Sequence, residues 1–265
     1  MIGISDGEFR LFQQFILNAA GITLSDAKKA LVCGRLEKRL HAHSLNSYRD
    51  YLSLITSASH KAEQQIAIDL LTTNETYFFR EPKHFNLLAR CASECPASRL
   101  FRVWSAASSS GEEAYSMAMT LADCRPHGEW EIFGSDISTR VLEKARRGHY
   151  PMERAKNISP DFLKRFCLKG TGPQAGTLLV TRELRERVRF GQINLNEALP
   201  NIGEFDVIFL RNVMIYFSND TKRQIVSRIV GCLRRGGYLC IGHSESLNGI
   251  CDTLQATAPS IYRKP

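Results

Sequence analysis

The sequence LFRVWSAASSSGEEAYSMAMTLADC, residues 100–124, contains the pattern that decides the fold. Residues 100–107 have the apolar character of a buried strand, and residues 112–124 have the length and apolar content of a helix. Small residues connect the two, and they allow a ligand to approach the backbone at the carboxyl end of the strand. Only Gly111 of this turn is a glycine, so the turn is neither a dinucleotide fingerprint nor a phosphate loop.

The remainder of the carboxyl-terminal part continues this alternation. Strands are predicted at 129–136, 187–194, 205–212 and 237–244, with helices at 138–147 and 220–235. Near-continuous apolar strands separated by helices are typical of a parallel sheet covered on both faces. Residues 150–190 interrupt the order with a short helix and a glycine-rich hairpin signal, which indicates a small inserted β-subdomain. The predicted class is therefore α/β, with a Rossmann-like sheet.

The first 72 residues differ, because their apolar residues favour helices throughout. Four helices are predicted, at about 6–20, 25–41, 48–55 and 66–71. We therefore divide the chain into a small all-α domain at 1–72, a linker at 73–90 that contributes to the ligand site, and the α/β domain at 91–265.

Composition indicates a soluble globular protein, with 43% apolar and 23% charged residues among 265. A membrane-spanning helix needs about 20 consecutive apolar residues, and neither such a run nor a signal peptide is present. We expect a cytoplasmic protein without membrane insertion. The eight cysteines form no CxxC pair, so free thiols and no metal site are expected.

The positive charge is concentrated in one segment. The chain has 35 basic and 27 acidic residues, a net charge of +8, and residues 137–190 account for all of it with 13 basic and 5 acidic residues. Such a surface suits nucleic acid, an anionic membrane or an acidic protein, and it can equally be a solvated face. No signature of a nucleic-acid-binding module accompanies it.

Acidic residues near two strand ends indicate an adenosine-containing ligand. Glu112 and Glu113 begin the helix after the first strand, and Asp136 ends the second strand. An acid at this second position is where a doubly wound fold holds a ribose. Without a phosphate loop, S-adenosylmethionine fits these residues better than NAD or ATP. The structural alternatives are that the glutamates favour the helix dipole and that Asp136 caps the next helix.

The predicted domain junction, residues 72–82, alternates polar residues with three aromatic ones. Asn74, Thr76 and Arg80 are expected to face a bound ligand, with capping and packing as the alternative role. The planar guanidinium of Arg80 suits a carboxylate, either of the cofactor or of a substrate side chain.

Polar residues also follow the apolar strand at 205–210. Arg211 and Asn212 come directly after it, at the sheet edge where ligands bind. Tyr216 then presents a hydroxyl able to orient a reactive group. His243 is expected to be a strand-end histidine that has no ligand partners.

These motifs together resemble the bacterial chemotaxis receptor methyltransferases, which are protein-glutamate O-methyltransferases. The resemblance covers nearly the whole chain, from about residue 5 to Tyr262, and the motifs occur in the expected order. They are TTNETYFFR at 72–80, WSAASSSGEEAYSMAM at 104–119, SDIS at 135–138, INL at 193–195, FLRNVMIYF at 209–217 and GGYLCIGHSE at 236–245.

The resemblance implies a class I methyltransferase domain that uses S-adenosylmethionine and releases S-adenosylhomocysteine, without a metal. The implied reaction methylates glutamate side chains of chemoreceptors and gives methyl esters, as part of sensory adaptation in chemotaxis. Tyr216 matches the family's tyrosine beside the transferred methyl group, and we expect Arg80 and Tyr216 to be catalytic by orienting the substrate carboxylate. The implied cofactor contacts are Asn74, Thr76, Arg80, Glu113, Asp136, Asn194, Leu195, Arg211 and Asn212.

Two implied surfaces bind the receptor. Lys28, Arg35 and Arg39 resemble the basic helix face that family members turn toward glutamate-rich methylation helices, with a solvated face as the alternative. Gly170, Gly172 and Gly176 resemble the loop of members whose subdomain binds a pentapeptide at the receptor's C-terminus. A monomer is expected, and nucleic acid is not an expected partner.

Two other classes remain open at this point. A nucleic-acid methyltransferase would use the same cofactor fold and a basic patch, but the chain has neither a DPPY or NPPY tetrapeptide nor a Pro-Cys pair. A non-catalytic cofactor-binding adaptor is the other class, and the presence of Asn74, Arg80, Glu113, Asp136 and Tyr216 argues against such a loss of activity.

Overall fold

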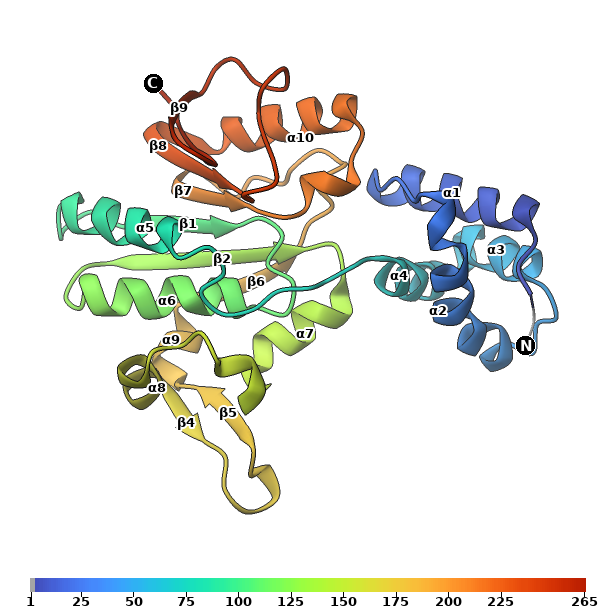
Figure 1. Cartoon of the computed structure of the whole chain (residues 1–265), viewed down its shortest axis with the longest axis horizontal. Helices are drawn as coiled ribbons and strands as arrows, with labels where there is room; N and C mark the ends of the chain where they lie inside the picture. Colours follow the sequence, from blue (N-terminus) through green and yellow to red (C-terminus); the bar gives the residue numbers. More distant parts are fainter. Residues whose placement is uncertain (1–2) are drawn as a thin grey trace.

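The computed structural model describes residues 3–265, which form a helical domain, a sheet domain and a small projecting sheet (Figure 1). The helical domain consists of α1 (Asp6–Ala20), η1 (Asp26–Lys28), α2 (Lys29–Ala42), α3 (Tyr48–Thr56), η2 (Ala58–His60) and α4 (Lys61–Leu71). Ser5 and Glu8 form a capping box at the start of α1, and Gly21 ends this helix with a φ of 71°.

The helical domain has its own apolar core. Phe12 lies at its centre, with its ring centroid 6.2 Å from that of Tyr48 and 6.4 Å from that of Tyr51. One buried carboxylate is included, because Glu63 accepts hydrogen bonds from Arg39 and from the Tyr51 hydroxyl. This buried ion pair fixes α2 and α3 against α4.

The sheet domain contains a seven-stranded sheet in the order β6-β2-β1-β7-β8-β10-β9. Its first five strands are parallel, and β10 and β9 continue the sheet antiparallel. The strands are β1 (Phe101–Ser105), β2 (Trp130–Asp136), β6 (Val188–Gln192), β7 (Phe205–Leu210), β8 (Leu233–Ile241), β9 (Gln255–Ala258) and β10 (Ile261–Arg263). This arrangement confirms the predicted α/β class.

Helices cover both faces of the sheet, and the alternation of strand residues explains why. Val103, Val207 and Phe209 point into a core shared with α5 and α6, whereas Trp104 and Ile208 point into a core on the side of α10. The helices of this domain are α5 (Lys83–Glu94), α6 (Glu112–Cys124), α7 (Thr139–Arg147), α9 (Arg182–Glu186) and α10 (Asn219–Gly231).

The inserted segment projects from the sheet domain (Figure 1) as a three-stranded antiparallel sheet in the order β3-β5-β4. Two contacts join it to the turn after β1. The Tyr150 hydroxyl donates to the Ser110 carbonyl at 2.7 Å, and the Arg154 guanidinium pairs with buried Glu112. Its elements are β3 (His149–Pro151), η3 (Met152–Ala155), α8 (Pro160–Phe166), β4 (Cys167–Lys169), η4 (Gly172–Gln174) and β5 (Thr177–Val180).

The structure differs from the sequence-based expectation in several places. The helix predicted at 220–235 ends at Gly231, and residues 233–235 already belong to strand β8. Residues 83–94 form α5, although most of them were assigned to the linker, because Phe85 and Leu88 pack into the core of the sheet domain. The antiparallel strands β9 and β10 were not predicted, since they are short and only their Ile261 is buried. The eight cysteines are all present as thiols. Among the described residues, no helix has the length and apolar character needed to cross a bilayer.

Candidate active site

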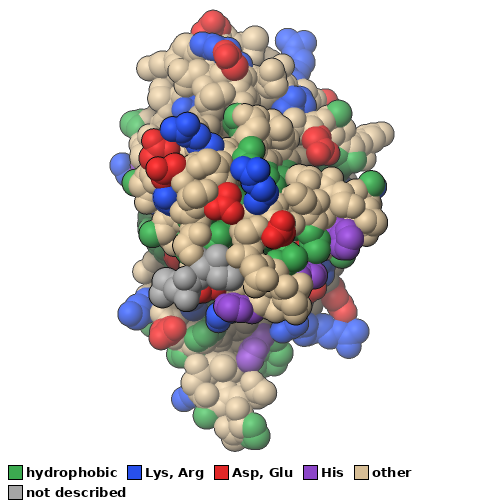
Figure 2. All heavy atoms as spheres, turned by 90° about the vertical axis from the view of Figure 1, so that its right-hand side faces the viewer, with side chains coloured by type: hydrophobic (Ala, Val, Ile, Leu, Met, Phe, Trp, Pro, Cys, Tyr) green, Lys and Arg blue, Asp and Glu red, His purple; other side chains and the backbone are tan. Residues whose placement is uncertain are grey.

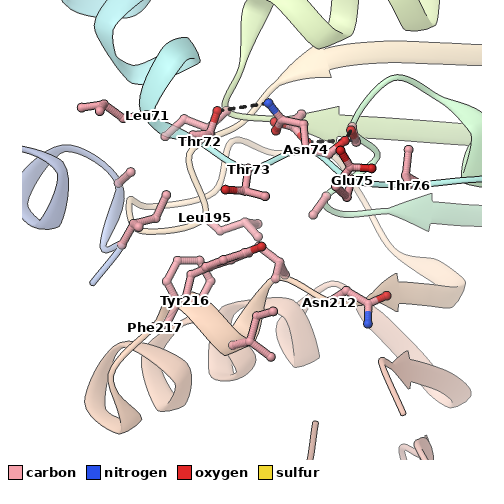
Figure 3. A pocket seen from close by; sticks show the side chains of 18 of the residues that line it. Leu71, Thr72, Thr73, Asn74, Glu75, Thr76, Leu195, Asn212, Tyr216 and Phe217 are labelled. Carbon is pink, nitrogen blue, oxygen red and sulfur yellow. Dashed lines mark hydrogen bonds between the residues drawn. The ribbon is translucent and has the colours of Figure 1, made fainter. Parts of the chain in front are cut away.

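A cavity of about 370 Å³ lies between the helical domain and the carboxyl ends of the parallel strands. The helical domain contributes residues 20–31. The crossing segment, residues 72–82 between α4 and α5, passes along the cavity (Figure 3) and runs from one domain to the other (Figure 1). Eleven of the predicted site residues line it, namely Lys28, Asn74, Thr76, Arg80, Glu113, Asp136, Asn194, Leu195, Arg211, Asn212 and Tyr216. The structure therefore brings all the predicted cofactor contacts to one place.

The crossing segment is fixed to the turn after β1. The Ser109 hydroxyl donates to the Asn74 carbonyl at 2.7 Å, and the Asn74 side-chain amide donates to the Thr72 hydroxyl at 3.2 Å. Figure 3 shows residues 72–76 along one side of the cavity, opposite Tyr216. Because this segment leads from α4 to the sheet domain, the domain junction is itself a wall of the site.

Asp136 ends β2 and is buried at the cavity edge. Its carboxylate accepts main-chain N–H groups from Ser109 and Ser138, both at 2.9 Å. Burial nevertheless raises the pKa of Asp136 to about 6, and the nearby Asp69 carboxylate adds to this effect. Asp69 belongs to α4 and accepts the N–H groups of Thr139 and Arg140, which cap α7. The helical domain thus holds the helix that follows Asp136.

Glu113 is engaged within the protein. Its carboxylate accepts the Ser105 hydroxyl at 2.7 Å and faces Arg211 at 2.8 Å. Burial raises the pKa of Glu113, while the adjacent guanidinium of Arg211 opposes that change. Arg211 also donates to the Arg80 carbonyl at 2.5 Å and lies 3.1 Å from Glu81. Arg211, which follows β7, is thus buried and joins α6 to the crossing segment.

Two cationic side chains in the cavity have no carboxylate partner among the residues that the structure describes. They are Arg80, whose guanidinium lies 5.5 Å from the centroid of the Tyr77 ring, and Lys28 at the end of η1. Asp136 and Glu113 are already hydrogen-bonded, so Arg80 and Lys28 are the free cations of the cavity, and the Glu75 carboxylate lines it as well. Both are available to an anionic group of a ligand.

Tyr216 ends η5 (Met214–Tyr216), and its hydroxyl points toward the middle of the cavity (Figure 3). The main chain around it is joined to the helical domain, because the Thr23 N–H donates to the Tyr216 carbonyl at 2.8 Å and Ile22 forms a β-bridge with Phe217. The position of Tyr216 therefore depends on how the two domains meet.

Backbone strain is concentrated around this cavity. Six described non-glycine residues have a positive φ, and four of them lie in the cavity wall or next to Arg80. These four are Phe79 (53°), Glu81 (57°), Ser109 (48°) and Asn212 (56°). Left-handed conformations at such residues cost free energy and persist where the surroundings impose them, often at functional sites.

Two of the three basic residues predicted to form a receptor-binding face have partners within the protein. Arg39 pairs with buried Glu63, and Arg35 donates to the carbonyls of Leu71 and Thr72 at the start of the crossing segment. Lys28 lies in the 3-10 turn η1 before α2 and lines the cavity. Figure 2, which faces the helical domain, shows basic and acidic side chains interspersed. The structure thus leaves less free positive charge here than the sequence predicts.

The three predicted glycines of the inserted sheet do not line the cavity. Gly172 and Gly176 have φ values of 53° and 82°, and a Cβ at Gly170 would lie 2.0 Å from the Gln174 carbonyl oxygen. All three positions therefore require glycine for the turn between β4 and β5. This turn is exposed at its tip, and peptide binding there stays a prediction.

One expectation about His243 is wrong, because potential ligands do surround it. Glu81, His84 and His243 bring one ligand atom each within 4.8 Å of one another. However, the Glu81 Oε2 atom that faces both histidines also lies 3.1 Å from Arg211. A divalent cation at this atom would be repelled by that guanidinium. Burial lowers the pKa of His84 to about 4, so it is neutral and packs beside the ion pair.

Sequence reasoning missed the apolar contribution of the helical domain to the site. Ile22, Leu24 and Leu31 line the cavity together with Ile137 and Ile193. In the sequence these residues look like ordinary core positions of two separate domains. The only signal for their role would have been the contact between the domains, which the sequence does not encode locally.

Comparison with known proteins agrees with this geometry. Residues 74–262 match the family described as CheR methyltransferase, SAM binding domain, and residues 7–72 match the CheR methyltransferase, all-alpha domain. The chemotaxis protein methyltransferase of Escherichia coli strain K12 is 46% identical over 98% of this chain and 92% of its own length. Chemotaxis protein methyltransferase 2 of Pseudomonas aeruginosa is 41% identical over 96% and 92%. The chain thus belongs to the CheR methyltransferase family, with its all-α domain and its SAM-binding domain.

Proposed function

We propose that this protein transfers the methyl group of S-adenosylmethionine to glutamate carboxylates of chemoreceptors, giving glutamate methyl esters and S-adenosylhomocysteine. The observation that carries the proposal is the cavity in which a free guanidinium, Arg80, and the hydroxyl of Tyr216 share the wall with buried Asp136. The names of the relatives, chemotaxis protein methyltransferases, support a receptor of the chemotaxis system as the substrate.

The residues of the cavity fit the proposed cofactor. Asp136 is a buried acceptor at the strand end where this fold holds a ribose. Leu195 and Ile193 offer apolar surface for the adenine, with Asn194 beside them. The cofactor supplies an activated methyl group on a sulfonium. No metal takes part in the proposed reaction.

The proposed substrate needs no general base. A glutamate side chain has a reference pKa of about 4.3, so it is an ionised nucleophile at neutral pH. The protein has to align this carboxylate with the methyl group in a site that excludes water, and such alignment lowers a barrier by about 7–11 kcal/mol. We assign this task to Arg80, which pairs with the carboxylate, and to Tyr216, which donates a hydrogen bond to it.

The proposal extends to how the receptor is bound. We infer that Lys28 at the cavity mouth and the helical domain contact the methylated region, and that the β4–β5 turn binds a C-terminal receptor pentapeptide by adding a strand. The exposed edge of the inserted sheet supports the second inference. We further propose that the protein acts as a monomer in the cytoplasm and does not act on nucleic acid.

Transfer of labelled methyl from S-adenosylmethionine to membranes that contain chemoreceptors tests the proposed function, with nucleic acid as a parallel substrate. Label on the receptor that alkali releases as volatile methanol is the expected result, because carboxyl methyl esters are base-labile. Alkali-stable label, or label on nucleic acid, would mean the right cofactor with the wrong substrate. No label despite cofactor binding would favour an adaptor.

A further inference from the structure

A second hollow lies directly beside the cavity, and the two share Ile215 as a wall. It measures about 380 Å³ and is enclosed by η5, the first turns of α10 and the loop at 244–250. The Ile215 side chain that separates the hollows is 54% exposed. A molecule that reaches Tyr216 from solvent on this side therefore passes over Ile215.

The hollow has a fixed wall. Glu245 accepts the N–H groups of Asn212 at 2.9 Å, Met214 at 2.8 Å and Gly242 at 2.7 Å. These three bonds satisfy the only carboxylate among the described residues that line the hollow. They also fix the segment that carries Ile215 and Tyr216, so the hollow and the methyl-transfer site share one rigid wall.

The free charge of the hollow is positive. Arg223 is neutralised by Asp220, at 2.7 Å, and also donates to the Gly249 carbonyl, which closes the rim. Lys222 lines the same hollow and has no ion-pair partner within the described part of the chain. A partly buried lysine without a carboxylate partner suits an anionic side chain, because Arg223 and Glu245 are already paired and the rest of the lining is neutral.

We propose that this hollow binds an acidic side chain of the substrate protein, adjacent to the carboxylate that is methylated. The inference rests on the proposed function, since the substrate chain is what brings both carboxylates to the two sides of Ile215. Lys222 then pairs with the second carboxylate while the Ile215 side chain packs against the substrate backbone between them. The hollow determines which glutamates are methylated and does not take part in methyl transfer.

The test compares Lys222→Glu, Lys222→Ala and Lys222→Arg with Arg235→Glu as the matched control. Arg235 is an exposed cation of the same domain, near the start of β8 and far along the strand from the hollow. Initial rates are measured against the concentration of a soluble receptor cytoplasmic fragment, and cofactor Kd is measured by calorimetry. We expect KM for the fragment to rise about fivefold or more in Lys222→Glu at low salt, with kcat and cofactor Kd retained.

Three further outcomes are decisive. Lys222→Arg should keep the wild-type KM, high salt should shrink the difference between Lys222→Glu and wild type, and a Glu→Lys change near the methylated residue of the receptor should restore the activity of Lys222→Glu. A KM in Lys222→Glu and Lys222→Ala equal to that of Arg235→Glu would overturn the proposal, and so would a loss confined to kcat or to cofactor affinity. If the wild-type protein transfers no methyl to the receptor, the proposed function itself fails, which is a different result.

Discussion

Asp136 provides a pH signature of cofactor binding that can be calculated from its environment. Burial raises the pKa of this carboxyl to about 6 in the free protein, despite the N–H groups of Ser109 and Ser138 that favour the charged form. An ionised carboxylate is the stronger acceptor for the two ribose hydroxyls. The affinity for the cofactor is therefore high above this pKa and decreases as the pH falls through it.

The size of the effect follows from the ionised fraction. With a pKa of about 6, Asp136 is almost fully ionised at about pH 7.5 and about one-tenth ionised at about pH 5. The Kd for S-adenosylhomocysteine should therefore rise about tenfold between these two pH values. Calorimetric titrations at half-unit intervals measure it, because they separate affinity from any pH effect on catalysis.

Asp136→Asn is the matched variant, since an amide keeps an acceptor oxygen but cannot titrate. We predict weaker binding at high pH and a Kd that no longer changes with pH. Glu113 and Glu75 are the other carboxylates that line this cavity, and a residual slope in the variant would report groups other than Asp136. A wild-type Kd that is constant over this range, or an equal slope in Asp136→Asn, would refute the reasoning.

Three more predictions follow from individual contacts. Tyr216→Phe should lower kcat about tenfold and leave the cofactor Kd unchanged, because it removes one hydrogen bond to a charged group. Steady-state kinetics and calorimetry measure these two quantities. A decrease in kcat matched by an equal loss of cofactor affinity would count against the orienting role. Asp69→Ala should lower the free energy of unfolding by about 1 kcal/mol, because it removes the acceptor of the Thr139 and Arg140 N–H groups at the start of α7. Denaturant unfolding measures this, and unchanged stability would show that the cap is dispensable. Phe12→Ala should lower the free energy of unfolding by about 3–5 kcal/mol, because the Phe12 side chain is fully buried in the helical domain. An unchanged melting temperature would contradict this prediction.

The residues at the strand ends were predictable from the sequence because of how a parallel sheet is built. Asp136 and Arg211 each follow an apolar strand, and the carboxyl ends of parallel strands meet at one edge. Asn74 and Arg80 were found from their unusual mixture with aromatic residues at the domain junction. Local pattern was sufficient in these cases, since it fixes which end of an element a side chain occupies.

Contacts between distant segments were not predictable in this way. The pairing of Arg211 with Glu81 and Glu113 joins three elements, and no local pattern indicates it. The same holds for the hydrogen bond from the Asn194 side-chain amide to the Ala19 carbonyl, which holds the end of α1 beside the cavity. Such contacts depend on how the two domains pack, and the closure of the cavity follows from them.

The partners of the charged side chains were also not predictable, because they depend on the packed structure. Arg35 and Arg39 share a helix face in the sequence, yet one holds the start of the crossing segment and the other neutralises buried Glu63. Spacing in the sequence is the same for an arginine that pairs with a buried carboxylate and for an arginine that has no partner. Only their neighbours distinguish them.

The most direct test of the central claim is mass-spectrometric mapping of a receptor cytoplasmic fragment after incubation with S-adenosylmethionine and either the wild-type protein or Arg80→Ala. We predict the added mass of one methyl group on defined glutamate side chains with the wild-type protein, its loss after mild alkali, and strongly reduced incorporation with Arg80→Ala. Methylation of lysine, arginine or the chain termini, or equal incorporation by Arg80→Ala, would contradict the proposed alignment of a glutamate carboxylate in this cavity.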